Sequence, residues 1–153
     1  MQNIFNQDFR EFIEALNAHK VEYILVGGYA VILHGYLRTT GDLDIWLNRT
    51  EDNYLKFIKA GNSFGLPTAQ FTLSNFLSNF DIDVFSFGKP PMAIDIMLEV
   101  KGLNFKECFE KSQFQDVEGL SVNVIWLPHL IAAKKAAGRG KDLVDIEYLD
   151  QEE

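Results

Sequence analysis

Two kinds of hydrophobic spacing alternate along the chain and predict its secondary structure. Apolar residues recur every three to four positions over residues 8–19, which predicts an amphipathic helix begun by Asp8 and Glu11 in the spacing of a capping box. The segment VEYILVGG predicts a buried strand ended by two glycines, and the alternating DLDIWL predicts a half-buried strand over 42–48. Between them, YAVILHG predicts a short buried helix that ends at Gly35.

The remaining segments continue this alternation. Thr50 is a candidate N-cap for a helix in NRTEDNYLKFIKAGNSFG, and IDVFSFG and MAIDIMLEV predict two strands joined by a proline-containing turn after Lys89. SVNVIWL predicts a strand that pairs with FQDVE as a hairpin. Further helices are expected in NFLSNF, NFKECFEKS, 129–138 and 141–150. About five strands interspersed with helices predict an α/β (α+β) fold, a small mixed sheet flanked by helices, in one domain over 1–153.

Composition and charge exclude several classes of protein. An apolar content of 47% with 24% charged residues is typical of a folded globular protein, and a net charge of −8 argues against a surface built to hold nucleic acid. The longest uncharged stretch, 23–37, is shorter than the roughly 20 residues that span a bilayer. The single Cys108 and an acidic N-terminal segment without a signal-peptide pattern predict a cytoplasmic protein that does not contact membranes.

The two aspartates of DLDIWL are candidates for chemistry. Residues two apart on a strand point to the same face, so Asp42 and Asp44 project together while Leu43, Ile45 and Leu47 face the core. Carboxylates held side by side repel each other unless a cation lies between them, and Mg²⁺ is bound by carboxylates, waters and substrate phosphates. The alternative is a solvated acidic strand face, because a D-x-D pattern recurs by chance.

Asp95 adds a third carboxylate. It lies in MAIDIMLEV between two isoleucines, in a segment apolar enough to be a central strand, where a charge needs a partner or a metal. If this strand lies beside the 42–48 strand, the three aspartates share one face and suit a two-metal site. The alternative for Asp95 is a structural salt bridge to Lys134 or Arg38.

Gly27 and Gly28 supply a place for phosphates. They lie between a strand and a helix, where a backbone without side chains can approach an anion that also faces unpaired N–H groups. A plain tight turn is the alternative, and Arg38 could either contact a phosphate or neutralise Asp42. Taken together, the glycines and aspartates predict a site for a nucleoside triphosphate with its metal.

A basic segment stands out in this acidic chain. Residues 129–141 contain four positive charges and no acid, and could contact a triphosphate or an RNA backbone, although a solvated helix face is the alternative. The charges are Lys134, Lys135, Arg139 and Lys141. Asp142 is expected to cap the last helix. Asp81 and Asp83 repeat the D-x-D spacing without an upstream glycine turn and are interpreted as an acidic entry to a strand.

The string G-G-x-A-x-x-x-H-G-x-x-R-x-T-x-D-x-D, followed by the isolated IDI, resembles the nucleotidyltransferase superfamily of the polymerase-beta type. It is most similar to small bacterial members found in toxin–antitoxin and abortive-infection systems. The matching residues are Gly27, Gly28, Ala30, His34, Gly35, Arg38, Thr40, Asp42 and Asp44. LIAAKKAAGRGKDLVDIEYL also resembles the closing element of those proteins, with Lys134, Arg139, Lys141, Asp142 and Asp145 as its polar positions.

The resemblance implies a Mg²⁺-dependent enzyme that moves a nucleoside monophosphate from an NTP to a hydroxyl of an RNA, a protein or a small molecule, with release of pyrophosphate. Asp42 and Asp44 would bind the metal ions, and Asp95, in the same metal site, would help to activate the acceptor hydroxyl. The residues implied to contact the nucleotide are Gly27, Gly28, Arg38, Thr40 and Lys134.

One position departs from the family pattern. Many catalytically proven members have a serine directly after the glycines, where this chain has Tyr29, so Thr39 or Thr40 is the candidate for the missing hydroxyl. This departure favours a second hypothesis, in which the same fold binds a nucleotide or a partner without turnover, for instance as a toxin–antitoxin component. An antitoxin-like protein would then be the partner. A second copy of the chain is the other partner considered, because a single small domain leaves little room for an acceptor site. A sugar-nucleotide site or a nuclease would leave the Gly-Gly turn unexplained.

Overall fold

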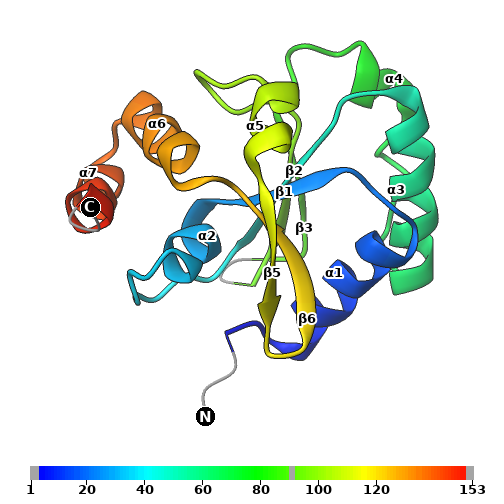
Figure 1. Ribbon diagram of the computed structural model, residues 1–153. Coiled ribbons are helices and arrows are strands. Elements are labelled where there is room, and N and C mark those ends of the chain that lie inside the picture. The colour runs from blue at the N-terminus through cyan, green and yellow to red at the C-terminus, as the bar shows by residue number, and fades with distance from the viewer. Residues whose placement is uncertain (1–3, 90–91, 151–153) are drawn as a thin grey trace.

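The computed structural model describes residues 4–89 and 92–150, and within them the chain forms six strands in one mixed sheet with seven helices (Figure 1). The strands are β1 (Tyr23–Val26), β2 (Leu43–Leu47), β3 (Val84–Phe87), β4 (Ile94–Met97), β5 (Gln113–Val117) and β6 (Leu120–Val124). The helices are α1 (Gln7–Ala18), α2 (Gly27–Leu33), α3 (Glu51–Phe64), α4 (Leu73–Leu77), α5 (Phe105–Lys111), α6 (Leu127–Ala137) and α7 (Gly140–Leu149). The α/β class is confirmed, with one strand more than the expected five or so.

The order of the strands in the sheet is β3-β4-β2-β1-β6-β5. β2 pairs with β1 in antiparallel and with β4 in parallel orientation, and β1 pairs with β6 in parallel orientation. β3 is antiparallel to β4, and β5 forms the expected hairpin with β6. The MAIDIMLEV strand therefore lies beside the DLDIWL strand, which was the condition for Asp95 to join the other aspartates.

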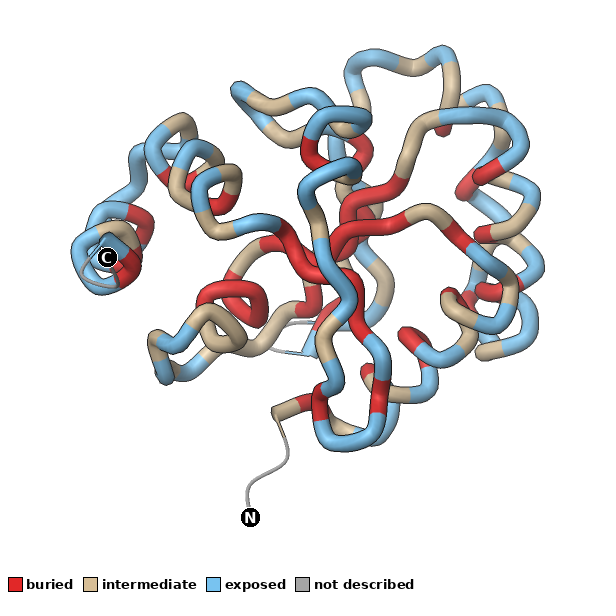
Figure 2. Tube along the Cα trace, in the orientation of Figure 1, coloured by how far each residue is buried: buried red, intermediate tan, exposed pale blue. Residues whose placement is uncertain are grey.

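Helices cover both faces of the sheet. α1, α3 and α4 lie on one side, whereas α2 and α6 lie on the other, with α7 outside them (Figure 1). The buried segments converge on the central strands (Figure 2), and Leu43, Ile45 and Leu47 are fully buried, as the alternation in β2 predicted. Between α1 and α3, the ring of Phe12 contacts Phe57 with centroids 6.3 Å apart. This packing places the carboxylate face of β2 on the side of α2 and α6.

Some boundaries differ from the prediction for local reasons. α1 is capped by Asn6, whose side chain accepts the N–H of Phe9 at 2.8 Å, so Asp8 lies in the first turn instead of starting the helix. α6 begins at Leu127 because Pro128 fits the first turn, where its missing N–H has no partner to lose. Thr50 is the N-cap of α3, as predicted.

Two further predictions differ from the structure. Asp42 lies directly before β2, outside the strand. The helix expected in NFLSNF begins two residues earlier, at Leu73, because Thr72 caps it by accepting the N–H of Asn75. Of the turn after Lys89, the two prolines lie outside the described residues.

None of the helices within 4–89 and 92–150 is both long enough and apolar enough to cross a membrane.

Asn53 is a buried polar residue that holds α3 to the ends of β1 and β2. The residue is 1% exposed, and its Oδ1 accepts the N–H of Glu22 at 2.7 Å. Its Nδ2 donates to the carbonyls of Glu22 and Asn48 at 3.0 and 2.9 Å. One amide therefore satisfies three backbone groups that have little access to water.

We expect Asn53→Ala to lower the free energy of unfolding by about 2–4 kcal/mol, because these backbone groups lose their partners inside the protein. Urea denaturation measures the change. Lys59→Ala, at an exposed position of the same helix, is the control and should change stability by less than about 0.5 kcal/mol. Equal losses in the two variants would contradict the role assigned to Asn53.

Candidate functional site

Three carboxylates meet where β2 and β4 begin. The parallel register places Asp44 directly beside Asp95, so their side chains share one face of the sheet. Asp42 precedes β2, and its Oδ1 accepts the N–H of Ala93 at 3.3 Å. All three aspartates line a cavity of about 410 Å³, referred to below as the carboxylate cavity. Its other lining residues are Gly27, Gly28, Arg38, Thr39, Thr40, Gly41, Lys134, Arg139 and Lys141.

The charges of these carboxylates are incompletely balanced. The pKa of Asp44 is raised from 3.8 to about 7, first by burial and then by the negative charges of Asp95 and Asp42. The charge of Lys134 opposes this rise without cancelling it. A carboxyl group held beside two others in partial burial is a place where an added cation lowers the electrostatic energy.

The glycine pair brings the backbone against the carboxylates. Gly27 has φ +71°, and a Cβ there would overlap the carboxylate of Asp44. A Cβ on Gly28 would overlap the side chain of Thr40. Both glycines are thus required by the packing of α2 against β2 and the loop before it. This requirement exists without any ligand, and both glycines line the carboxylate cavity.

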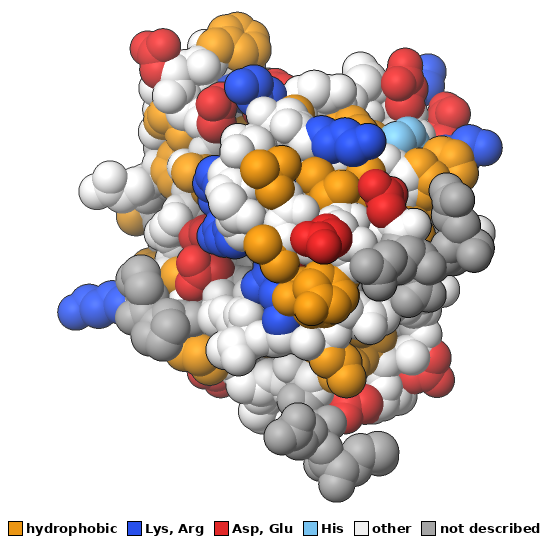
Figure 3. All heavy atoms as spheres, turned by 90° about the vertical axis from the view of Figure 1, so that its left-hand side faces the viewer, with side chains coloured by type: hydrophobic (Ala, Val, Ile, Leu, Met, Phe, Trp, Pro, Cys, Tyr) orange, Lys and Arg blue, Asp and Glu red, His pale blue; other side chains and the backbone are white. Residues whose placement is uncertain are grey.

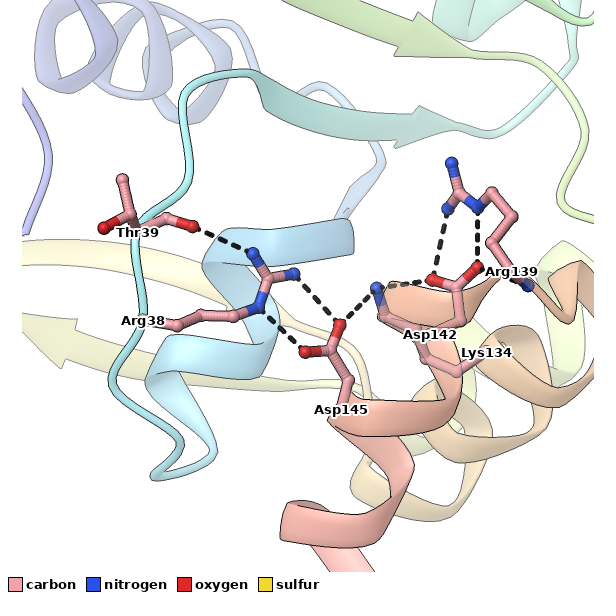
Figure 4. Close-up of polar contacts among 6 residues, drawn as sticks. All are labelled: Arg38, Thr39, Lys134, Arg139, Asp142 and Asp145. Carbon is pink, nitrogen blue, oxygen red and sulfur yellow. Dashed lines mark hydrogen bonds and ion pairs between the residues drawn. The ribbon is translucent and has the colours of Figure 1, made fainter.

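A network of alternating charges joins α6 and α7 to the loop after α2 (Figure 4). The buried Lys134 places its Nζ 3.1 Å from Oδ1 of Asp142 and 3.0 Å from Oδ2 of Asp145. Asp145 also receives Arg38, with Nε 2.9 Å from Oδ1 and a second contact of 3.0 Å to Oδ2. Asp142 receives Arg139 at 2.6 Å. The network therefore fixes three cations at the wall of the carboxylate cavity.

The network explains the ionisation of its innermost carboxylate. Burial opposes the charge of Asp142, but hydrogen bonds from Arg139 and Lys134 outweigh it and lower the pKa of this group. Asp142 also accepts the N–H of Arg139 at 3.2 Å, so it caps α7 from the third position while Arg139 occupies the N-cap. Asp142 therefore caps the helix as expected, but from its third position and not from the N-cap position.

The structure does not show the alternative contacts considered for Arg38 and Asp95. Arg38 does not neutralise Asp42; it pairs with Asp145, and its other contact is to the carbonyl of Thr39 at 3.0 Å. Because Lys134 and Arg38 both pair with Asp145, neither forms the salt bridge considered for Asp95 among the described residues. Instead, the carboxylate of Asp95 accepts a hydrogen bond from a hydroxyl group.

That hydroxyl belongs to Ser86, a residue that sequence reasoning missed. Ser86 lies opposite Asp95 in the antiparallel β3–β4 pair, and its Oγ donates to Oδ1 of Asp95 at 2.7 Å. The signal was present in VFSF, where a single polar residue interrupts an apolar strand, but the register with β4 was needed to read it. Ser86, Asp95 and Asp44 form one row across three adjacent strands.

Tyr29 is a core residue. Its ring is buried against Phe5 and Phe9, with centroids 5.1 and 5.8 Å away. Burial and the charge of Asp42 raise the pKa of its hydroxyl. Thr39 and Thr40, the candidates for the hydroxyl missing after the glycines, both line the carboxylate cavity.

An aromatic stack also joins α7 to the segment after α2. Tyr148 stacks on Tyr36 with centroids 4.1 Å apart and rings 4° from parallel. On the outer side of the helix, Leu143 and Val144 are exposed, and Figure 3 shows apolar side chains among charged ones on this face. The stack and the Arg38–Asp145 pair together hold α7 against the loop that leads to Asp42.

The donor set fits a metal shared with a ligand better than one enclosed by protein. Within the described ranges, no three His, Cys, Asp or Glu side chains are grouped to hold a metal ion by themselves. Mg²⁺ is commonly bound by one or two carboxylates and completed by waters and substrate phosphates. The neighbouring carboxylates of Asp42 and Asp44, with basic residues lining the same cavity, suit that kind of coordination.

No protein-family model and no curated protein matches the chain. Several solved structures match its fold. The lincosamide antibiotic adenylyltransferase LnuA, solved with lincomycin bound, superposes with a TM-score of 0.61 at 16% identity over 97% of this chain and 98% of its own. A predicted nucleotidyltransferase from Thermotoga maritima gives 0.56 at 14% identity over 95% and 91%. An antigenic nucleotidyltransferase-like protein from Paracoccidioides brasiliensis gives 0.53 at 12% identity over 92% and 72%. The chain therefore has the fold of the nucleotidyltransferase superfamily.

We expect Asp44→Asn to raise the free energy of unfolding at pH 8 in metal-free buffer by about 2–4 kcal/mol, since each unit of the raised pKa represents about 1.4 kcal/mol. The substitution removes a charge that the folded protein disfavours. Thermal and urea denaturation measure the gain. Asp81→Asn, at an exposed aspartate before β3, is the matched control and should shift stability by no more than about 0.5 kcal/mol. A loss of stability in Asp44→Asn would refute the repulsion argument.

Asp145→Asn should lower the free energy of unfolding by about 2–4 kcal/mol, because Lys134 then keeps one carboxylate partner and Arg38 keeps none. Guanidinium denaturation provides the measurement. Glu147→Gln, exposed on the same helix, controls for loss of a negative charge in α7. If both variants were equally stable, the network would not hold α7 in place.

Proposed function

We propose that this protein transfers a nucleoside monophosphate from an NTP to a hydroxyl of an RNA, a protein or a small molecule, with release of pyrophosphate. The observation that carries the proposal is the lining of one cavity by three aspartates together with basic side chains and the Gly-Gly backbone. Acidic residues that attract a divalent cation and basic residues that attract a polyanion are both needed for a metal–triphosphate complex. The nucleotidyltransferase fold supports the same reaction.

The basic residues would divide the work of binding phosphates. Lys141 is exposed and can turn toward a triphosphate, whereas Arg139, although 60% exposed, is held by Asp142. Lys134 and Arg38 are already held by Asp145 and would act as fixed charges from the cavity wall. Fixed charges need no reorganisation when a ligand binds, which favours electrostatic stabilisation of the reacting phosphate.

The glycines and the threonine beside them would complete the phosphate site. Because Gly27 and Gly28 have no side chains, a phosphate could approach their backbone closely. The hydroxyl of Thr40 lies next to Gly28. Thr40 would then take the place of the serine that many members of the superfamily carry after the glycines. Its hydroxyl lines the same cavity as the carboxylates.

Asp42 and Asp44 would hold Mg²⁺, and Asp95 would accept the proton of the acceptor hydroxyl. When bound, the metal would supply charge neutralisation on the triphosphate. The acceptor oxygen would bond to the α-phosphorus while the bond from that phosphorus to the bridging oxygen of pyrophosphate breaks. Ser86 would orient Asp95 through its hydrogen bond of 2.7 Å.

A module that binds a nucleotide without turnover remains the second candidate. The observation that favours it is the buried ring of Tyr29, which leaves the position after the glycines without a hydroxyl in the carboxylate cavity. The two candidates differ in a single outcome, because only the enzyme releases pyrophosphate.

Isothermal titration with each NTP should detect binding that requires Mg²⁺ and disappears with a chelator. The double variant Asp42→Asn/Asp44→Asn should bind at least about tenfold more weakly, since it loses both carboxylates that would hold the metal. Asp81→Asn/Asp83→Asn removes the other D-x-D pair of the chain and should bind like the wild type. The absence of binding by any NTP would overturn the enzyme proposal for this chain.

Pyrophosphate release under the same conditions separates turnover from binding. A candidate hydroxyl acceptor and the bound NTP should yield pyrophosphate in the wild type, and the double variant should yield none above the buffer rate. Binding that depends on Mg²⁺ but never yields pyrophosphate, with acceptors from all three classes, would favour the non-catalytic candidate.

A further inference from the structure

A second cavity, of about 360 Å³, shares a wall with the carboxylate cavity. Gly27, Asp44, Lys134 and Arg139 line both spaces. Asp44 therefore stands between them, with Asp95 beside it in the β2–β4 register. A molecule that fills the second cavity and extends past Asp44 brings its end group to the carboxylates.

The lining of this second cavity is largely aliphatic, and it is called the apolar cavity below. Val26, Val84 and Met97 contribute from three strands of the sheet, and Leu130, Ala133 and Ala137 contribute from α6. These side chains offer no hydrogen-bond donors or acceptors. They suit a compact apolar ring system more than the polar edges of a nucleobase.

The charges of the apolar cavity differ from those of the carboxylate cavity. Asp142 is occupied by Lys134 and Arg139, so the remaining charges that line only the apolar cavity are Asp83 and Glu99 against Lys101. Glu99 contacts Arg49 at 3.2 Å, but its side chain is 54% exposed. Two acids against one base, on a chain of net charge −8, disfavour a phosphate backbone.

The size of the apolar cavity points the same way. Cavities that bind small molecules commonly measure about 300–1,000 Å³, and 360 Å³ lies within that range. A ring system with a short side chain fits such a volume.

We propose that the apolar cavity binds the acceptor, and that the acceptor is a small hydroxyl-bearing molecule with an apolar ring system and a neutral or positive charge. This inference rests on the proposed function and narrows its acceptor class. The acceptor hydroxyl crosses the wall at Asp44 and meets Asp95, which takes its proton as the oxygen bonds to the α-phosphorus and pyrophosphate leaves. The nucleotide stays in the carboxylate cavity, with its phosphates among the basic residues.

The test fills the apolar cavity and measures its two possible occupants separately. Ala133→Phe places a ring in the cavity, whereas Ala132→Phe places the same ring on the exposed side of α6. The probe for the cavity is 6-propionyl-2-(dimethylamino)naphthalene, a neutral fluorescent ring system whose emission shifts in apolar surroundings. Ala133→Phe should weaken its binding by at least about tenfold, and Ala132→Phe by less than about threefold.

Mg²⁺–NTP affinity, measured by titration, is the second readout. Ala133→Phe should keep it within about threefold of the wild type, since the nucleotide lies elsewhere. If Ala133→Phe binds the probe normally, or loses NTP affinity along with the probe, the acceptor assignment is overturned, and in the latter case the cavity holds the nucleobase. Ala137→Phe fills the same cavity from its exposed end and serves if the first variant unfolds.

A matched pair of ligands tests the charge of the acceptor. Tyramine and 4-hydroxyphenylacetate carry the same phenol with a cationic and an anionic side chain. Tyramine should displace the fluorescent probe at a concentration at least about tenfold lower than 4-hydroxyphenylacetate. Equal displacement would overturn the charge preference. If wild-type protein binds the probe and tyramine but no NTP, the cavity exists as described and the proposed function fails instead.

Discussion

A buried ammonium group determines how the C-terminal helices meet the rest of the protein. Lys134 has little access to water, and such a charge is tolerated only with close partners of opposite sign. Its partners Asp142 and Asp145 are buried too, and each takes a further cation from the surface. Since Arg38 belongs to the loop that leads to Asp42, the same chain of contacts positions α7 and one wall of the carboxylate cavity.

The three carboxylates of the cavity repel one another. Negative charges gather at Asp42, Asp44 and Asp95, beside a glycine pair where there is no space for a side chain. Both the repulsion between the carboxylates and the two flexible glycines disfavour the folded state. The surrounding apolar strands offset that disadvantage. Such a concentration of unfavourable choices in one small region is common at sites that bind charged ligands.

Local sequence patterns could predict the strands and the direction of Asp44, because alternation along a strand determines side-chain direction, whereas Asp42 lies before β2 and reaches the same cavity from the loop. The apolar residues on either side of Asp95 indicated that it lies in a central strand. The partners of Arg38 and the contact of Ser86 could not be predicted, because they depend on how distant segments pack. Asn6 replaced Asp8 as the cap of α1 for a related reason: several polar residues precede the helix, and the backbone conformation selects among them.

The parallel pairing of β1 with β6 has a consequence for the order in which the molecule assembles. Leu25 lies opposite Val124, so one edge of β1 pairs with β2 and the other edge pairs only with β6, the last strand of the sheet to be synthesised. During synthesis, the apolar β1 has an uncovered edge until most of the chain has left the ribosome. α6 and α7 follow β6, and with them come Lys134 and Arg139. The carboxylate cavity is therefore completed last, and a chain that stops before α6 retains the aspartates and Arg38 without Lys134, Arg139 and Lys141.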